Sequence, residues 1–256
     1  MALNVDVMKA TQALERELND VFEILGVVNE TDKNLLTTRR IVSERDGNHS
    51  NLYFRVLSLF KQYAPPRLPA DIYLDKLLKT GNRLLELKEY RLAMTECFQR
   101  FLLGKNLWPE SVKRADAICA EHGRITCQAH LLLQIDPEVH KGETLDHFKR
   151  LLGDVITCTQ EVAVEQSEDT YWLVYNGTVV LMSLCQTLIQ HGYYAVAVEP
   201  LLFAALSMES QVPLLDAGYL SWRCRIYETV CLCYEFLENL EAAQKCAERW
   251  HSQVCR

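Results

Sequence analysis

Four residues in the middle of the chain could bind a metal: Cys119, His122, Cys127 and His130. Zinc takes thiolate and imidazole ligands, and pairs spaced two residues apart commonly supply them. Such pairs are usually a dozen or more residues from each other, because the chain must fold back between them. Here only four residues, Gly123 among them, separate the pairs. If the segment is helical, the two cysteines are simply part of an apolar face, so we predict no metal site, with zinc as the alternative.

The other residues that could do chemistry do not form a recognisable site. The glycines are too far apart for a dinucleotide-binding loop or a P-loop, and there is no G-x-S-x-G nucleophile turn. The carboxylates of Glu165, Glu168 and Asp169 lie in a polar connector and indicate a solvated acidic loop. His147, like the two histidines above, does not belong to a recognisable pattern of catalytic carboxylate or nucleophile residues in the sequence. We therefore predict that the chain is not an enzyme and has no catalytic residue, cofactor or small-molecule substrate.

Composition and charge exclude further classes of protein. The chain is 49% hydrophobic and 24% charged, as is typical of a folded globular protein. Glycine (10) and proline (7) are scarce, which disfavours β-sandwiches and barrels with many tight turns. The net charge is −7, and no lysine or arginine lies between Arg150 and Arg223. Without a basic stripe for phosphates, nucleic acid is not an expected partner.

The ten cysteines do not indicate disulfides. Cys97, Cys185, Cys231 and Cys246 have apolar neighbours at helical spacing, where cysteine acts as a small hydrophobic residue. The first residues, MALNVDVMKATQALERE, contain neither the apolar core nor the cleavage site of a secretory signal. We therefore expect reduced thiols and a cytoplasmic location.

One segment is long and apolar enough to be considered as a membrane span. Residues 171–198 carry no charge, but polar residues such as Asn176 and Gln186 interrupt them, and only acidic residues flank them. A helix buried on all sides within a helical protein is the favoured interpretation, and no membrane partner is expected.

Helical patterns cover most of the chain. They predict helices over residues 5–27, 35–45 and 52–63, with a polar turn at 29–34, and over 110–133 and 145–164, with a loop at 136–142. The run APPRLP at 64–69 cannot continue a helix and is the main predicted boundary. We assign residues 1–63 to N-terminal helices and 70–256 to a tetratricopeptide-like helical array.

Residues 72–103 carry two apolar stripes at helical spacing, joined by a short turn, and predict an antiparallel helical pair. The spacing of three residues resembles that of a tetratricopeptide-type pair. A small residue is followed nine positions later by a large apolar residue, and three positions after that by an alanine. The phrase occurs three times, as Gly81…Tyr90…Ala93, Cys185…Tyr194…Ala197 and Cys231…Leu240…Ala243. The fold class is thus all-α, either a tetratricopeptide-like α-solenoid or an irregular helical bundle. Pro200 should kink or restart the helix that contains it.

The last third of the chain is expected to form one stack. Residues 172–189 and 219–237 are too apolar to face solvent and are predicted to be adjacent helices, with 207–218 as the connector. The final pair, 220–250, has no obvious polar cap. We expect an apolar face that includes Ala247 and Trp250, and hence either a longer solenoid or a neighbouring molecule. The isolated chain should then self-associate.

Two stretches resemble a known family. PPRLPADIYLDKLLKTGNRLLELKEYRLAMTECFQRFL, and WLVYNGTVVLMSLCQTLIQ with the later run SMESQVPLL…YLSWR, resemble the N-terminal region of cilia- and flagella-associated protein 54. The resemblance implies a structural component of the ciliary axoneme, in the C1 projection of the central apparatus. It implies a role in cilium assembly and movement, including in sperm flagella, with other projection proteins as partners. The alternative is a cytoplasmic tetratricopeptide-like adaptor.

Overall fold

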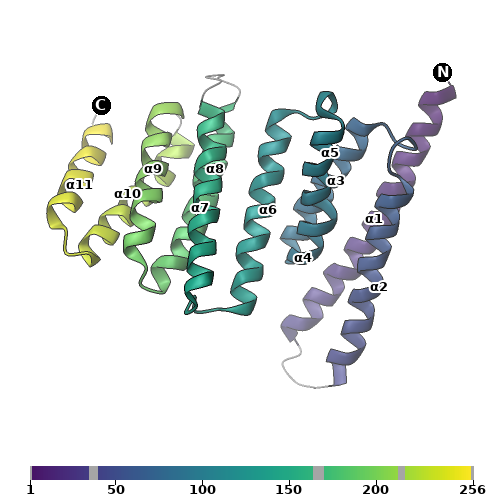
Figure 1. Cartoon of the computed structure of the whole chain (residues 1–256), viewed down its shortest axis with the longest axis horizontal. Coiled ribbons are helices and arrows are strands. Elements are labelled where there is room, and N and C mark those ends of the chain that lie inside the picture. The colour runs from purple at the N-terminus through teal and green to yellow at the C-terminus, as the bar shows by residue number, and fades with distance from the viewer. Residues whose placement is uncertain (1, 35–39, 164–169, 213–216, 255–256) are drawn as a thin grey trace. The chain divides into compact units, whose positions relative to one another are not determined.

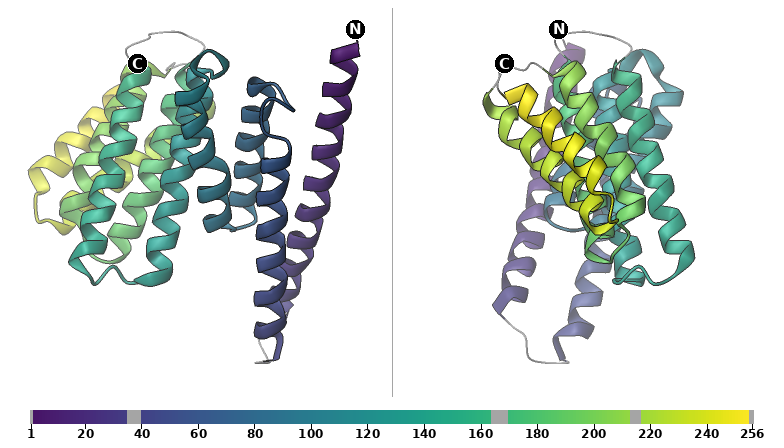
Figure 2. Two further views of the ribbon diagram at one scale, coloured as in Figure 1. Left: turned by 45° about the vertical axis from the view of Figure 1, so that its right-hand side comes forward. Right: turned by 90° about the vertical axis from the view of Figure 1, so that its left-hand side faces the viewer.

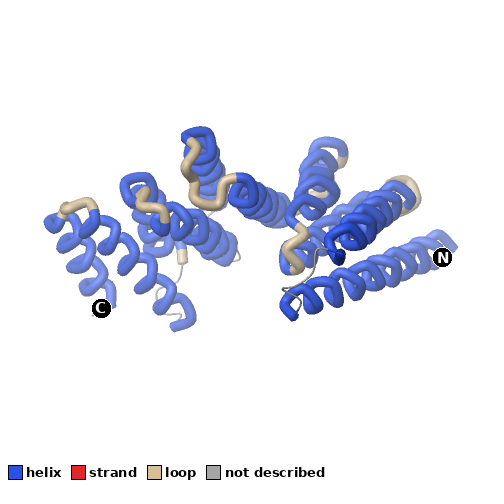
Figure 3. Tube along the Cα trace, turned by 90° about the horizontal axis from the view of Figure 1, so that it is seen from below, coloured by secondary structure: helices blue, strands red, loops and turns tan. Residues whose placement is uncertain are grey.

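The computed structural model describes residues 2–34, 40–163, 170–212 and 217–254 of the chain. Every regular element within these ranges is a helix, joined to the next by a short connection (Figures 1 and 3). The prediction of an all-α protein is therefore confirmed. The chain forms two compact units, Met1–Gln128 and Ala129–Arg256. The break at residues 64–69 lies inside the first unit, and the assignment of residues 70–256 to one repeat array stays a prediction.

The first unit begins with two long helices, α1 (Ala2–Asn34) and α2 (Arg40–Gln62), which run side by side (Figure 2). The sequence-based boundaries were wrong here. The polar run at 29–34 belongs to the end of α1, and the two helices expected at 35–45 and 52–63 form one helix over the described range from residue 40. A single glycine, Gly47, lies in this stretch, and its cost of about 1 kcal/mol weakens a long helix without ending it.

An apolar stripe on α1 forms one wall of the first core. It recurs at steps of three and four residues, so its members share one helix face. The stripe packs into a cluster with the apolar residues of α2 and α3 (Ala70–Glu86). Its members on α1, all at most 3% exposed, are Leu14, Leu18, Val21 and Leu25.

The predicted antiparallel pair at 72–103 is confirmed. Its first helix is α3, and its second begins after a short turn at Tyr90 as α4 (Tyr90–Leu92) and ends as α5 (Gln99–Leu107). A Cβ atom at Gly81 would lie only 2.8 Å from Cε1 of Phe98, so glycine permits the close approach of the two helices. Ala93, on the opposite helix, is fully buried.

Between α4 and α5 the helix widens into a π-helical segment, η1 (Ala93–Phe98). A π-turn closes its hydrogen bond over five residues instead of four, and it inserts one residue into an otherwise α-helical path. Cys97 and Phe98, at the end of this segment, are the side chains that meet Gly81.

The connection to the second unit contains a 3₁₀ turn, η2 (Pro109–Ser111), and a long helix, α6 (Arg114–Ile135). This helix begins later than the predicted start at residue 110. After the expected loop comes α7 (Gly142–Ala163). Asp136 fixes the loop, because its carboxylate accepts hydrogen bonds from the backbone N–H groups of His140 (3.1 Å) and Lys141 (2.9 Å).

In the second unit α7 packs on α8 (Tyr171–Gln190), α8 on α9 (Tyr194–Gln211), α9 on α10 (Ala217–Phe236), and α10 on α11 (Leu240–Val254). Pro200 lies inside α9, and the helix continues through it. One expectation was wrong, because Ser207–Gln211 extend α9 instead of forming a connector. Of that connector, residues 213–216 lie outside the described residues. α8 is long and apolar enough to cross a membrane, and half of its most apolar stretch is buried inside the protein.

The three hairpins that carry the repeated sequence pattern share one turn geometry. In each, the residue seven positions after the small residue has positive φ: Lys88 (64°), Gly192 (82°) and Glu238 (57°). In each, the N–H of the next residue donates a 2.9 Å hydrogen bond to a carbonyl five residues earlier. This is the bond that closes a helix C-terminus around a left-handed residue. The donor and acceptor pairs are Glu89 to Leu84, Tyr193 to Leu188, and Asn239 to Tyr234.

The apolar segments 172–189 and 219–237 lie in neighbouring helices, as predicted. Nε1 of Trp222 on α10 donates a 2.9 Å hydrogen bond to Oγ1 of Thr178 on α8. The ring of Tyr175 contacts those of Tyr219 (4.9 Å between centroids) and Trp222 (5.9 Å). Aromatic pairs at these separations stabilise a contact beyond the area they bury, so α8 and α10 are joined directly as well as through α9.

Candidate protein-binding surfaces

The four residues considered for zinc all lie on α6, which does not fold back between the two pairs. His122 and Cys127 are buried, and Cys119 is half-buried. Burial raises the pKa of the Cys119 thiol to about 11 and that of Cys127 to about 12, and it lowers the pKa of His122 to about 4. Within the described residues there is no group of three His, Cys, Asp or Glu side chains placed to hold a metal.

The cysteines of the described ranges are free thiols. Cys97 and Cys185 are fully buried, as predicted, and burial raises the pKa of both thiols. Cys231 and Cys246 are only half-buried. The Sγ of Cys185 lies 3.7 Å from the carbonyl of Ala197, and Cys231 repeats that contact in the next hairpin, so these thiols fill the same place in two copies.

The remaining residues considered for chemistry do not converge. Glu165, Glu168 and Asp169 lie outside the described residues. Nδ1 of His147 lies 2.7 Å from the carbonyl oxygen of Glu143, one turn earlier on its own helix. The surfaces that stand out are instead hydrophobic.

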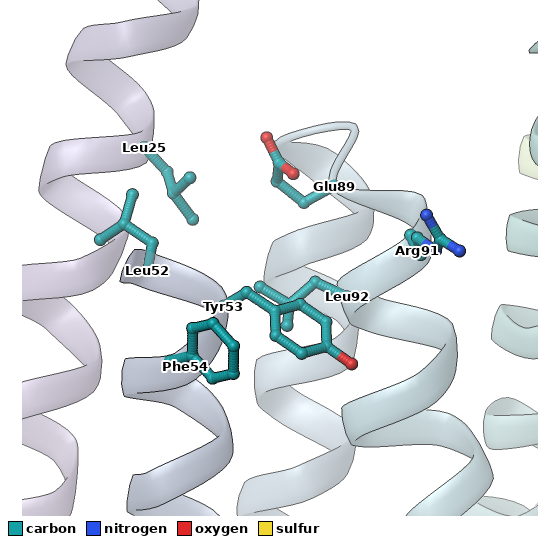
Figure 4. Close-up of a pocket in the computed structure, with 7 residues that line it drawn as sticks. All are labelled: Leu25, Leu52, Tyr53, Phe54, Glu89, Arg91 and Leu92. Atoms are coloured by element: carbon teal, nitrogen blue, oxygen red, sulfur yellow. The ribbon is translucent and has the colours of Figure 1, made fainter. Parts of the chain in front are cut away.

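A groove opens in the first unit beside the α3–α4 turn (Figure 4). Its volume is about 460 Å³. Phe54 at its mouth is 64% exposed, whereas the other apolar side chains are largely buried. The side chains that line it, drawn in Figure 4, are Leu25, Leu52, Tyr53, Phe54, Glu89, Arg91 and Leu92. An apolar floor with one exposed aromatic ring and a charged rim is typical of a peptide-binding surface.

A buried carboxylate, that of Glu96, fixes one wall of this groove. The hydroxyl of Tyr53 on α2 donates a 2.8 Å hydrogen bond to Oε1 of Glu96. The other carboxylate oxygen of Glu96 forms a 2.5 Å ion pair with Arg100. Because Glu96 is only 7% exposed, this contact ties α2 to the π-helical segment and holds the wall in place.

A second buried charge, Arg223, holds α10 to the end of α9. Its Nη2 donates hydrogen bonds to the carbonyl oxygens of Met208 (2.9 Å) and Val212 (2.6 Å). These carbonyls belong to the C-terminal end of α9, where the last groups have no partner within the helix and the helix dipole favours a cation. Arg223 therefore acts as a cap contributed by the next helix.

Glu209, also in the run that carries the family resemblance, links three helices. Arg249 on α11 donates to its carboxylate from Nε (3.1 Å) and Nη2 (2.6 Å), and the hydroxyl of Tyr227 on α10 donates to it as well. Although burial opposes the charge of Glu209, hydrogen bonds from Arg249 and Tyr227 hold the pKa of this carboxyl below its ordinary value. Trp250 stacks on Tyr227 at 5.5 Å between ring centroids.

The expected open apolar face on α11 is not found among the described residues. Trp250 is half-buried against Tyr227 and so does not belong to an open apolar face. Ala247 is exposed, but on the same stripe Gln244 and His251 are exposed and polar. The outer side of this hairpin is therefore mixed in polarity.

Apolar side chains gather instead around the α10–α11 turn, which we call the turn patch. Phe236 is 60% exposed and Leu240 68%, beside Leu232 at 43% and Leu237 at 39%. The segment 219–237 was predicted to be too apolar for solvent, and at this end that prediction was wrong. Sequence periodicity assigned these residues to a core because it cannot show which helix face lacks a neighbour.

The comparisons with known proteins agree with the resemblance found in the sequence. The family model described as cilia- and flagella-associated protein 54 matches residues 46–113 and 105–254. The human protein of that name is 31% identical over 233 residues, which cover 84% of this chain, and the mouse protein 29% over 234 residues with the same coverage. The protein of Chlamydomonas reinhardtii is 30% identical over 189 residues, or 70% of this chain.

The chain belongs to the cilia- and flagella-associated protein 54 family. It spans 7% of the length of the human and mouse relatives and 6% of that of the algal one. The matched residues include both the groove beside α3–α4, apart from Leu25 on α1, and the turn patch. They also include the run SMESQVPLL…YLSWR, in which Glu209 and Arg223 join helices α9 to α11 and Trp222 joins α10 to α8.

Proposed function

We propose that this chain is a structural component of the ciliary axoneme, in the C1 projection of the central apparatus. There it would serve cilium assembly and movement as a helical scaffold that binds other projection proteins. The observation that carries the proposal is the family match, which extends over both compact units. The relatives share the words cilia- and flagella-associated in their names.

The chemistry of the described residues supports a binding role over a catalytic one. Their buried charged side chains, Glu96, Asp136 and Arg223, are each hydrogen-bonded or ion-paired within the protein. We accordingly propose that the chain is not an enzyme and that its partners are proteins, not nucleic acid, membrane or a small molecule. Its location would be the cytoplasm and the cytoskeleton of the cilium.

A tetratricopeptide-like adaptor without a ciliary role is the second candidate. The observation that favours it is the turn geometry shared by the three hairpins, since repeated helical pairs form binding surfaces in many soluble proteins. A scaffold and an adaptor would use the same fold, and they differ in where the chain is retained.

Localisation of a tagged chain separates the two candidates. In ciliated cells the scaffold proposal expects the tag along the axoneme after the membrane is removed with detergent, and enrichment of central-apparatus proteins on purification. Retention on the axoneme is compared between two variants at exposed apolar positions (64% and 68%). Phe54→Ser alters the groove and should weaken retention, whereas Leu107→Ser on α5 is the control outside it. A diffuse, detergent-soluble tag with no axonemal protein enriched would refute the scaffold proposal and leave the adaptor.

A further inference from the structure

The turn patch is a preorganised hydrophobic surface. The rings of Phe236 and Tyr194 stack at 4.3 Å between centroids with planes 6° apart, so one face of Phe236 is covered and the other is open. Phe236 and Leu232 lie one turn apart on α10 and therefore share a face. Leu240, the first residue of α11, follows within four positions.

The backbone beneath the patch is fixed. The N–H of Leu237 donates to the carbonyl of Cys233 (3.1 Å), that of Glu238 to Glu235 (3.0 Å), and that of Asn239 to Tyr234 (2.9 Å). A surface that is already ordered loses little conformational entropy when a partner binds. Stacked aromatic rings and leucines held in this way are typical anchors of protein interfaces.

The rim of the patch is acidic. Its exposed carboxylates are those of Glu235 near the end of α10, Glu238 in the turn and Glu241 on α11. Lys245 pairs with Glu241 at 2.6 Å, so three glutamates and one lysine surround the turn and the excess charge is negative. An anionic rim repels nucleic acid and acidic lipid surfaces and attracts a cationic partner.

From this combination we propose that the turn patch binds a basic amphipathic helix of a partner protein. Apolar side chains of that helix, spaced at i and i+4, cover Phe236 and Leu240, and its lysines or arginines pair with the glutamates of the rim. The proposal does not depend on a ciliary location, because every contact that it uses belongs to the second unit of this chain.

The test measures binding of two synthetic helical peptides to the purified full chain by fluorescence anisotropy. Both peptides are about 18 residues long with leucines at i and i+4, as an amphipathic helix requires; one carries lysine at its polar positions and the other glutamate. The lysine peptide should bind, and more weakly as salt is raised, and the glutamate peptide should not.

Two variants and a matched control locate the site. Leu240→Gln should weaken the lysine peptide by about tenfold or more, as expected for loss of an interface anchor. Glu238→Lys should weaken it at low salt. Leu107→Gln, on α5 at the same 68% exposure as Leu240, should leave binding unchanged. Equal binding of the two peptides, no binding of either, or an equal loss in Leu107→Gln would overturn the proposal.

Discussion

The turn shared by the three hairpins predicts that substitutions at equivalent positions change the free energy of unfolding in opposite directions. Lys88 and Glu238 have positive φ although they carry a side chain, whereas Gly192 occupies the same place with none. All three are exposed, and a Cβ at Gly192 would meet nothing within 4 Å. Substitutions here therefore change the backbone conformational energy and little else.

The magnitude follows from two opposing terms. An L-residue in the left-handed region costs about 1–2 kcal/mol, which glycine does not incur. Glycine, however, gives the unfolded chain more conformational freedom, which offsets about 0.4–1 kcal/mol. Lys88→Gly should thus raise the free energy of unfolding by about 0.5–1 kcal/mol, and Glu238→Gly should do the same. Gly192→Ala should lower it by a similar amount.

Urea denaturation followed by circular dichroism measures these changes as shifts in midpoint at constant slope. Lys88→Ala is the control, since it removes the charge but keeps a side chain at positive φ, and its midpoint should stay within error of the wild type. If Lys88→Gly proved neutral or destabilising while Gly192→Ala was stabilising, the common turn would not be what closes these helices.

Three further substitutions probe the packing and the buried charges. Ala93→Leu should overpack the helix crossing and cost about 1–3 kcal/mol by denaturation, while Ala247→Leu, exposed on α11, should cost little. Arg223→Met removes two charge-assisted hydrogen bonds and should cost about 3–5 kcal/mol, against little change for the exposed Arg225→Met; equal costs would argue against the cap. Burial lowers the folded pKa of His122 to about 4 from 6.5, so the unfolded chain binds the proton first as the pH falls. Stability should thus drop by about 2–3 kcal/mol between pH 7.5 and 4.5, and His122→Gln should remove that part of the loss.

Local signals in the sequence were sufficient for the helical pairs. The stop at APPRLP and the phrase from Gly81 to Ala93 each depend on residues a few positions apart, and both predictions agree with the structure. Whether a helix continues through an unfavourable residue depends on more distant contacts. α9 continues through Pro200 because it packs on α8 and α10, whose contacts offset a lost backbone hydrogen bond.

The surfaces were harder to predict than the helices. An apolar stripe predicts burial, but Phe236 and Leu240 are exposed because no described helix covers their side of the turn. The burial of Arg223 does not follow from the sequence. The carbonyl oxygens that accept its hydrogen bonds are 11 and 15 residues away, and no local pattern shows that they lack a donor. The family resemblance includes the run SMESQVPLL…YLSWR, which contains Arg223, but it does not give the structural reason for this arginine.

The π-helical segment of the first hairpin has a consequence for how helical periodicity is interpreted. A π-turn adds one residue to an α-helical path, and one residue corresponds to about 100° of rotation around the helix axis. A comparison that applies one fixed period of about 3.6 residues to α4, η1 and α5 together would therefore assign the side chains after Phe98 to the wrong helix face.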